Sequence, residues 1–207
     1  MRFTPDSKFM VLCSRLVELT KINLLWLLCC LPLFTAGAAT TAMITCLYAF
    51  RSDEVCGSRV FFAAFRRNFK KATVLWLLIL FFAAMLAADY VLVAYMSFPG
   101  RLAVIGLIFF LLFALVLVSG LIFPLLSQFP GGLKETVVNA VLLSLANLPK
   151  MLLVTAMNLL PALLAVILPQ VFLLFGFVWL VCGFALMGWY DITVIEKIFA
   201  PYRVTEK

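Results

Sequence analysis

The 207-residue chain is 66% hydrophobic and 12% charged, with a mean hydropathy of +1.20, whereas soluble domains are about 45–50% apolar and about 25% charged. This composition excludes a water-soluble globular domain. The chain has no histidine, no CxxC pair and no P-loop motif, so we expect no enzyme, no metal site and no cofactor, and because its basic residues flank apolar segments we expect no nucleic-acid partner.

Long apolar stretches predict an all-α protein, a polytopic transmembrane helical bundle in which residues 1–207 form a single membrane domain. A bilayer core about 30 Å thick needs about 20 helical residues for each crossing. In chain order we expect about six membrane helices, over about 10–34, 38–51, 72–96, 102–128, 149–168 and 171–190, with amphipathic interfacial helices at about 58–71 and 132–147. A polar tail, beginning with a short helix, is expected from Asp191 onward.

The apolar stretch Ile22–Phe50 is too long for one span and contains its own break. Pro32 cannot donate a helical hydrogen bond and Gly37 tolerates turn geometry, which favours a short helical hairpin with its turn at Thr35–Gly37. The hairpin would place 15 of the 16 lysines and arginines on one side of the membrane, whereas a single crossing would divide them 11 to 5. Since basic residues concentrate on the cytoplasmic side, the hairpin predicts that both termini are cytoplasmic, and the single crossing remains the alternative.

The segment Ser58–Lys71 combines aromatic and basic side chains at helical spacing. An aromatic face opposite a cationic face is typical of a helix lying among lipid headgroups, where each basic residue near anionic lipid contributes about 1 kcal/mol. We therefore expect contact with the lipid bilayer and its anionic headgroups, with the docking of a partner protein as the functional alternative. The residues concerned are Phe62, Phe65 and Phe69 on the aromatic face, and Arg59, Arg66, Arg67, Lys70 and Lys71 on the basic side.

Asp89 is the one acidic residue well inside a predicted span, roughly 10 Å from its outer end at 1.5 Å per residue. An acid at the centre of a membrane helix costs about 2.5–3.5 kcal/mol, so such residues usually face the bundle interior or water. Asn158 lies at a comparable depth in another predicted span. The functional hypothesis is an intramembrane polar site for a substrate or ion, built from Asp89, Asn158 and Tyr90. The structural alternatives are a buried hydrogen bond between two helices, or an acid that reaches outward to the interface.

Several short segments that combine aromatic, basic and Pro/Gly positions resemble the YesL-like family of bacterial membrane proteins. The matching segments are Asn23–Leu28, Leu31–Leu33, Gly37–Ala42, Phe65–Lys71 and Asn147–Lys150. The family is a domain of unknown function, and its members are often encoded near carbohydrate uptake and degradation systems. The resemblance implies a bacterial cytoplasmic (inner) membrane protein, and it carries over no catalytic residue.

Two functional hypotheses follow. The first is an accessory or scaffold role beside a carbohydrate uptake system, with subunits of an ABC-type transporter as partners. The second is a small transporter with an intramembrane polar site around Asp89. A membrane enzyme is not expected, because no nucleophile lies beside a general base in any recognisable motif.

Overall fold

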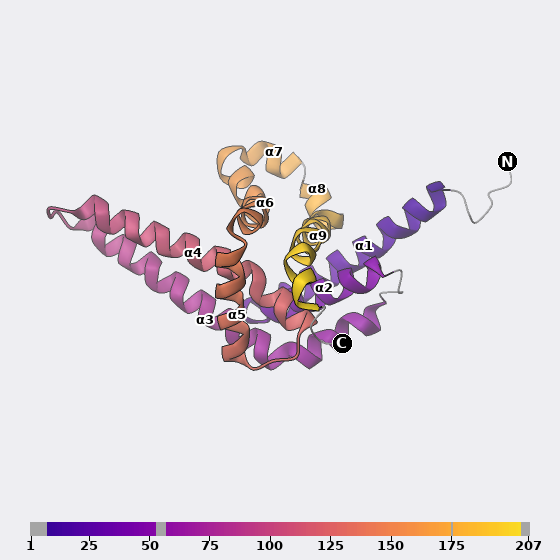
Figure 1. Ribbon diagram of the computed structural model, residues 1–207. Helices are drawn as coiled ribbons and strands as arrows, with labels where there is room; N and C mark the ends of the chain where they lie inside the picture. Colours follow the sequence, from indigo (N-terminus) through magenta and orange to yellow (C-terminus); the bar gives the residue numbers. More distant parts are fainter. Residues whose placement is uncertain (1–7, 53–56, 175, 204–207) are drawn as a thin grey trace.

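The computed structural model describes residues 8–52, 57–174 and 176–203, and within these ranges the chain is almost entirely helical and has no strand. This confirms the predicted all-α bundle (Figure 1). The elements are α1 (Lys8–Cys30), a 3₁₀ turn (Leu33–Thr35), α2 (Ala36–Arg51), α3 (Ser58–Tyr95), α4 (Arg101–Gln128), α5 (Leu133–Ala146), α6 (Leu148–Ile167), α7 (Pro169–Leu174), α8 (Gly176–Val178), a π-helical segment (Trp179–Gly183) and α9 (Phe184–Arg203).

Five helical stretches in the described part of the chain are long and apolar enough to cross a membrane. They are Leu33–Arg51, Ser58–Tyr95, Arg101–Gln128, Leu148–Ile167 and Gly176–Tyr202. The predicted span over 10–34 corresponds to α1, which is not among them because Arg15, Glu18 and Lys21 interrupt its apolar sequence. The count is therefore one lower than the six predicted, although α1 packs on the bundle like the other helices.

The first two helices form a hairpin, as the Pro32 break predicted. Trp26 Nε1 donates to Thr40 Oγ1 at 3.1 Å, which joins α1 to α2 across the turn. The turn lies at Leu31–Thr35, slightly earlier than predicted, because α1 already ends at Cys30 and α2 begins at Ala36. The Thr35 hydroxyl contacts the carbonyls of Cys29 and Pro32, and the Thr35 N–H also donates to the Pro32 carbonyl at 2.9 Å, so that the polar groups at the break are paired.

The central element of the bundle is α2, which packs against α1, α3, α4 and α9 and is buried along most of its length. Its first turns carry small residues, which allow close helix approach in membranes. At Gly37 a Cβ atom would lie 2.7 Å from the Ala72 carbonyl oxygen and 2.9 Å from Phe123 Cε1. Gly37 is therefore the point where α2, α3 and α4 come together.

The predicted interfacial helix 58–71 and the predicted span 72–96 form one continuous helix, α3. No glycine or proline interrupts Ser58–Tyr95, and its 38 residues extend about 57 Å at 1.5 Å per residue. The second half of α3 pairs with α4, and the two project away from the bundle (Figure 1). On the predicted aromatic face, Phe62 is 42% exposed, whereas Phe65 and Phe69 pack against the core, and the neighbouring Phe61 is fully buried.

In the C-terminal third of the chain, the helix predicted at 132–147 is present as α5, whereas the last membrane span lies further along the chain than predicted. Glu135 accepts a hydrogen bond from the Gly132 N–H at 2.9 Å and so caps the start of α5. The last apolar helix runs over Gly176–Tyr202 instead of 171–190. Asp191, which we predicted to begin a polar tail, consequently lies near the middle of a candidate membrane span.

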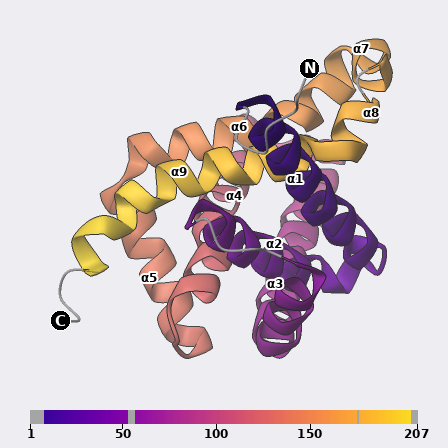
Figure 2. The ribbon, with the colours of Figure 1, turned by 90° about the vertical axis from the view of Figure 1, so that its right-hand side faces the viewer.

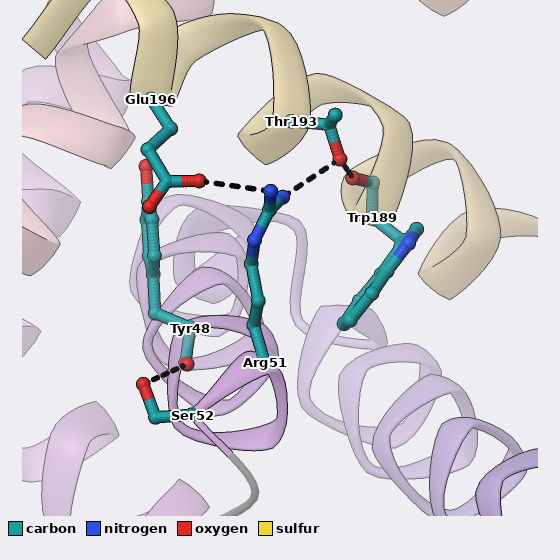
Figure 3. Close-up of polar contacts among 6 residues, drawn as sticks. All are labelled: Tyr48, Arg51, Ser52, Trp189, Thr193 and Glu196. Atoms are coloured by element: carbon teal, nitrogen blue, oxygen red, sulfur yellow. Dashed lines mark hydrogen bonds and ion pairs between the residues drawn. The ribbon is translucent and has the colours of Figure 1, made fainter. Parts of the chain in front are cut away.

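A polar clamp fixes α9 across the end of α2 (Figure 3). Arg51, in the last turn of α2, pairs with Glu196 at 3.1 Å and donates to Thr193 Oγ1 at 3.0 Å. Its guanidinium carbon also lies 6.0 Å from the centre of the Trp189 ring. Figure 2 shows the resulting arrangement, in which α9 runs beside α6 and contacts α2. The clamp sets the position of the turn of α9 that carries Asp191.

Candidate functional site

A cavity of about 510 Å³ lies within the bundle, bounded by residues of α1, α2, α3, α4, α6 and α9, with one residue of α7. Cavities of about 300–1,000 Å³ hold small ligands in many proteins. Most of the lining is apolar. The aromatic residues that line it are Trp26, Trp76, Phe123, Phe172 and Phe184.

Two polar residues on facing helices meet at this cavity. Asn158 of α6 donates to Asp191 Oδ2 of α9 at 2.8 Å, and its amide also donates to the Val154 carbonyl at 2.9 Å. The other carboxylate oxygen, Asp191 Oδ1, is buried and has no hydrogen-bond partner in the described part of the chain. The hydroxyl of Thr155, one turn before Asn158, is likewise buried without a partner among the described residues. Asp191 is also the only residue with an ionisable side chain in the described lining.

Local sequence explains how these side chains reach the cavity. Pro161 lies inside α6 and also lines the cavity; because proline has no N–H, the carbonyl one turn earlier loses its helical donor. On α9, Gly188 packs closely on α2, since a Cβ atom there would lie 2.8 Å from Leu47 Cδ1 and 3.2 Å from Met43 Cε. Asp191 follows Gly188 by one turn and therefore lies on the face of α9 directed at the bundle.

A π-helical segment, Trp179–Gly183, precedes α9 and is held by a fully buried asparagine of α1. Asn23 donates to the carbonyls of Leu180 at 2.7 Å and Trp179 at 3.2 Å, and it accepts from the Ala185 N–H at 2.9 Å. These are backbone groups that the irregular helix leaves without regular partners, and π-helical segments occur frequently at functional sites. Asn23 thus fixes the start of the helix that carries Asp191.

The structure separates Asp89 from Asn158, the pair that the sequence predicted. Asp89 is exposed on the projecting part of α3 and does not line the cavity, and the carboxylate that Asn158 contacts is that of Asp191. Tyr90 is also outside the cavity, where its ring lies 5.6 Å from that of Phe109 on α4. The reason is that α3 and α4 extend beyond the bundle, so that Asp89 has no third helix beside it.

The sequence contains a pattern that indicates that Asp191 lies inside a membrane helix. Beyond Tyr190, apolar residues continue at helical spacing in Ile192, Ile195 and Ile198, all of which are buried. This periodicity indicates that the membrane helix runs past Asp191, which is then an intramembrane acid of the kind that marks functional sites.

The basic residues of α3 keep the exposure that the sequence predicted, but its aromatic residues do not all face outward. Arg59, Arg66, Arg67 and Lys70 are exposed. Phe65 and Phe69 pack against the core. Lys71 Nζ donates to the Gly131 carbonyl at 2.7 Å and so ties α3 to the connection between α4 and α5.

Comparison with known proteins identifies one family model, a protein of unknown function designated DUF624, which matches residues 19–90. The matched region contains Asn23, Trp26 and Gly37 and extends to Tyr90, but ends well before Asp191. No curated protein and no solved structure matches the chain. The long apolar helices, together with this partial match to a family model of unknown function, fit a multi-pass membrane protein.

The described residues contain no group of three or more histidine, cysteine, aspartate or glutamate side chains that could hold a metal ion. The side-chain groups that line the cavity include the Asp191 carboxyl, the Asn158 amide, the Thr155 hydroxyl and the aromatic rings.

Proposed function

We propose that this chain is a multi-pass membrane protein that binds a small ligand in the cavity beside Asp191, and that it works as a small transporter. The observation that carries the proposal is the pair of buried oxygen atoms, Asp191 Oδ1 and Thr155 Oγ1, that have no partner among the described residues. An unsatisfied buried polar group costs about 1–3 kcal/mol, and native proteins pair nearly all such groups. A hydrogen-bond donor on a bound ligand would supply the missing partner.

The shape and lining of the cavity define the kind of ligand. Its apolar and aromatic walls suit a molecule with a mostly apolar body, and its polar groups suit one donor-bearing end. The transporter hypothesis that the sequence raised around Asp89 is thereby moved to Asp191 and Asn158.

Filling the cavity is expected to prevent binding. Ala162 and Ala165 line the cavity from α6, and Ala162→Phe would place a ring in the space. The neutral compound 4-bromobenzyl alcohol is a suitable probe, because its bromine quenches the fluorescence of nearby tryptophans and both Trp26 and Trp76 line the cavity. We expect Ala162→Phe to weaken quenching affinity about 10-fold or more, a loss of about 1.4 kcal/mol or more.

The matched control is Ala84→Phe, on the exposed surface of α3. Equal quenching of the native protein and both variants would mean that the probe does not use the cavity, and would contradict the proposal. If binding is confirmed, the release of the probe from proteoliposomes that contain only this protein tests transport.

A second candidate is an accessory role beside a carbohydrate uptake system, with subunits of an ABC-type transporter as partners. The resemblance to the YesL-like family supports it, and the exposed basic residues Arg59, Arg66, Arg67 and Lys70 provide a surface for a partner or for anionic headgroups. Purification in mild detergent, with identification of the co-purifying proteins, tests this role. The absence of transporter subunits from native preparations would count against it.

We further propose that the protein lies in the bacterial cytoplasmic membrane with both termini in the cytoplasm. Three contacts support a common side for the basic segments: Arg15 lies 5.9 Å from the Phe50 ring, Arg51 pairs with Glu196, and Lys150 Nζ donates to the Lys197 carbonyl. They place the end of α2 together with α1, and the start of α6 together with the end of α9.

In intact cells, we expect the exposed Cys13 on α1 to resist a membrane-impermeant maleimide, because the hairpin places it on the cytoplasmic side. A cysteine introduced at Pro99, in the exposed turn between α3 and α4, should react with the same reagent. Labelling of Cys13 from outside would overturn the orientation.

A further inference from the structure

The donors and acceptors around the cavity indicate the charge of its ligand. We propose that the cavity takes an organic cation, a substituted ammonium ion with an apolar or aromatic body. This inference rests on the proposed binding function and adds the chemical class of the ligand. It is carried by the hydrogen-bonding state of the residues that line the cavity and by the position of the basic side chains.

Most side-chain donors at the cavity are already used within the protein. Trp26 Nε1 donates to Thr40 Oγ1 and Trp76 Nε1 donates to the Leu33 carbonyl at 2.8 Å. The Thr40 and Ser119 hydroxyls donate to the carbonyls of Ala36 and Val116, at 2.8 and 2.7 Å. The Asn158 amide donates to Val154 and Asp191. Among the described lining donors, only the Thr155 hydroxyl has no hydrogen-bond partner, so an anionic ligand would find almost no donor to bind it.

The hydrogen-bond acceptors at the cavity, unlike its donors, are not all used within the protein. Asp191 carries the only ionisable side chain in the described lining, and no lysine or arginine is part of that lining. Its Oδ2 receives a neutral amide, which leaves the carboxylate charge uncompensated, and its Oδ1 has no partner in the described chain. Arg51 on the facing α2 is committed to Glu196 and Thr193 of α9. A ligand cation is the counter-charge that this arrangement lacks.

The aromatic lining favours the same ligand. Because both tryptophans use their N–H groups elsewhere, they offer the cavity their rings. The face of an aromatic ring attracts a cation through its electrostatic quadrupole, and the attraction strengthens when the contact is desolvated. A carboxylate together with tryptophan and phenylalanine rings is a combination suited to substituted ammonium groups, and one that disfavours anions.

The test compares three ligands of similar size. Phenyltrimethylammonium carries one positive charge but no N–H donor, so it tests the charge separately from the missing hydrogen bond. The neutral tert-butylbenzene has the same shape, and benzenesulfonate carries a negative charge. Each is measured by its displacement of 4-bromobenzyl alcohol from the purified full-length protein in a nonionic detergent. In the native protein we expect phenyltrimethylammonium to displace the probe and benzenesulfonate to fail to do so, although the net charge of +7 favours the anion.

Two variants assign the effect to Asp191. We expect Asp191→Asn to weaken the binding of phenyltrimethylammonium about 10-fold or more, because it removes one partner of a charge pair a few ångströms apart, and to leave the binding of tert-butylbenzene unchanged. The apparent affinity of each compound is compared between the native protein and the variant, so that the partition of the compound into detergent micelles cancels. Asp89→Asn removes the same charge from the exposed surface of α3 and should leave both affinities unchanged.

The outcomes distinguish a failure of the proposed ligand class from a failure of the proposed binding function. If 4-bromobenzyl alcohol binds and Ala162→Phe blocks it, but the cation shows no preference over the anion, the ligand class is wrong and the binding function stands. If no probe binds in the cavity, both proposals fail. The comparison of cation with anion uses only the native protein, so it remains decisive even if Asp191→Asn fails to fold.

Discussion

Replacement of Gly37 by valine is expected to cause one of the largest losses of stability available from a single substitution in this protein. A Cβ atom at this position would lie 2.7 Å from both the Ala72 carbonyl oxygen and Trp76 Cβ, and 2.9 Å from Phe123 Cε1. Two of these atoms belong to or adjoin the backbone of α3 and cannot rotate away. Overpacking a well-packed core typically costs about 1–3 kcal/mol, and we expect Gly37→Val to reach or exceed the upper value.

The measurement is the midpoint of thermal unfolding in detergent, together with the yield of folded protein from membranes. Gly106→Val is the matched control, because Gly106 also lies within a helix and a Cβ atom there meets nothing within 4 Å. If the two variants unfold at the same temperature, the close approach of α2, α3 and α4 does not control stability.

Replacement of Asn23 by leucine should be nearly as costly, for a different reason. Leucine is close to asparagine in size, so the packing of the buried position changes little, but the three hydrogen bonds to the π-helical segment and Ala185 are lost. A hydrogen bond between membrane helices averages only about 0.6 kcal/mol. Here, however, backbone groups at a buried helix irregularity would be left unpaired, at about 1–3 kcal/mol for each unsatisfied group. We therefore expect a loss of about 3 kcal/mol.

Hydrogen exchange gives this prediction a local measurement. The Ala185 amide, which donates to Asn23 Oδ1, should exchange faster in Asn23→Leu than in the native protein, while amides in the α3–α4 pair should not change. Asn139→Leu, at an exposed position of α5, controls for the change of residue type. Unchanged protection of Ala185 would show that the asparagine does not hold the π-helical segment.

Several features of the fold follow directly from local residues. The break at Pro32 depends only on the missing N–H of proline, and the structure ends α1 two residues earlier, at Cys30. The helix α5 lies where its periodicity predicted it. The predicted separation of 58–71 from 72–96 failed because a change from basic to apolar composition does not end a helix. Without glycine or proline in Ser58–Tyr95, the chain had no local reason to stop.

The residues of the candidate site could not be paired correctly from local sequence patterns. Asp89 and Asp191 are both acids in strongly apolar surroundings, and Asn158 could have met either of them. The choice depends on which helix lies beside α6, and that is decided by contacts between residues distant in the sequence: Gly188 against Leu47, and Arg51 against Glu196.

The sequence by itself determined that this is an all-α protein with long apolar helices and that basic residues collect in a few segments, and it favoured a hairpin of the first two helices over a single crossing. These properties depend on composition, on the helical period and on single residues such as Pro32, which act over a few residues of chain. Only the tertiary structure decided that Phe65 and Phe69 pack against the core while Phe62 stays exposed, that Asp191 instead of Asp89 meets Asn158, and that Asn23 holds the π-helical segment. Each of these depends on how a helix is rotated and which neighbour it has, and both are set by close packing at Gly37 and Gly188, between segments far apart in the chain.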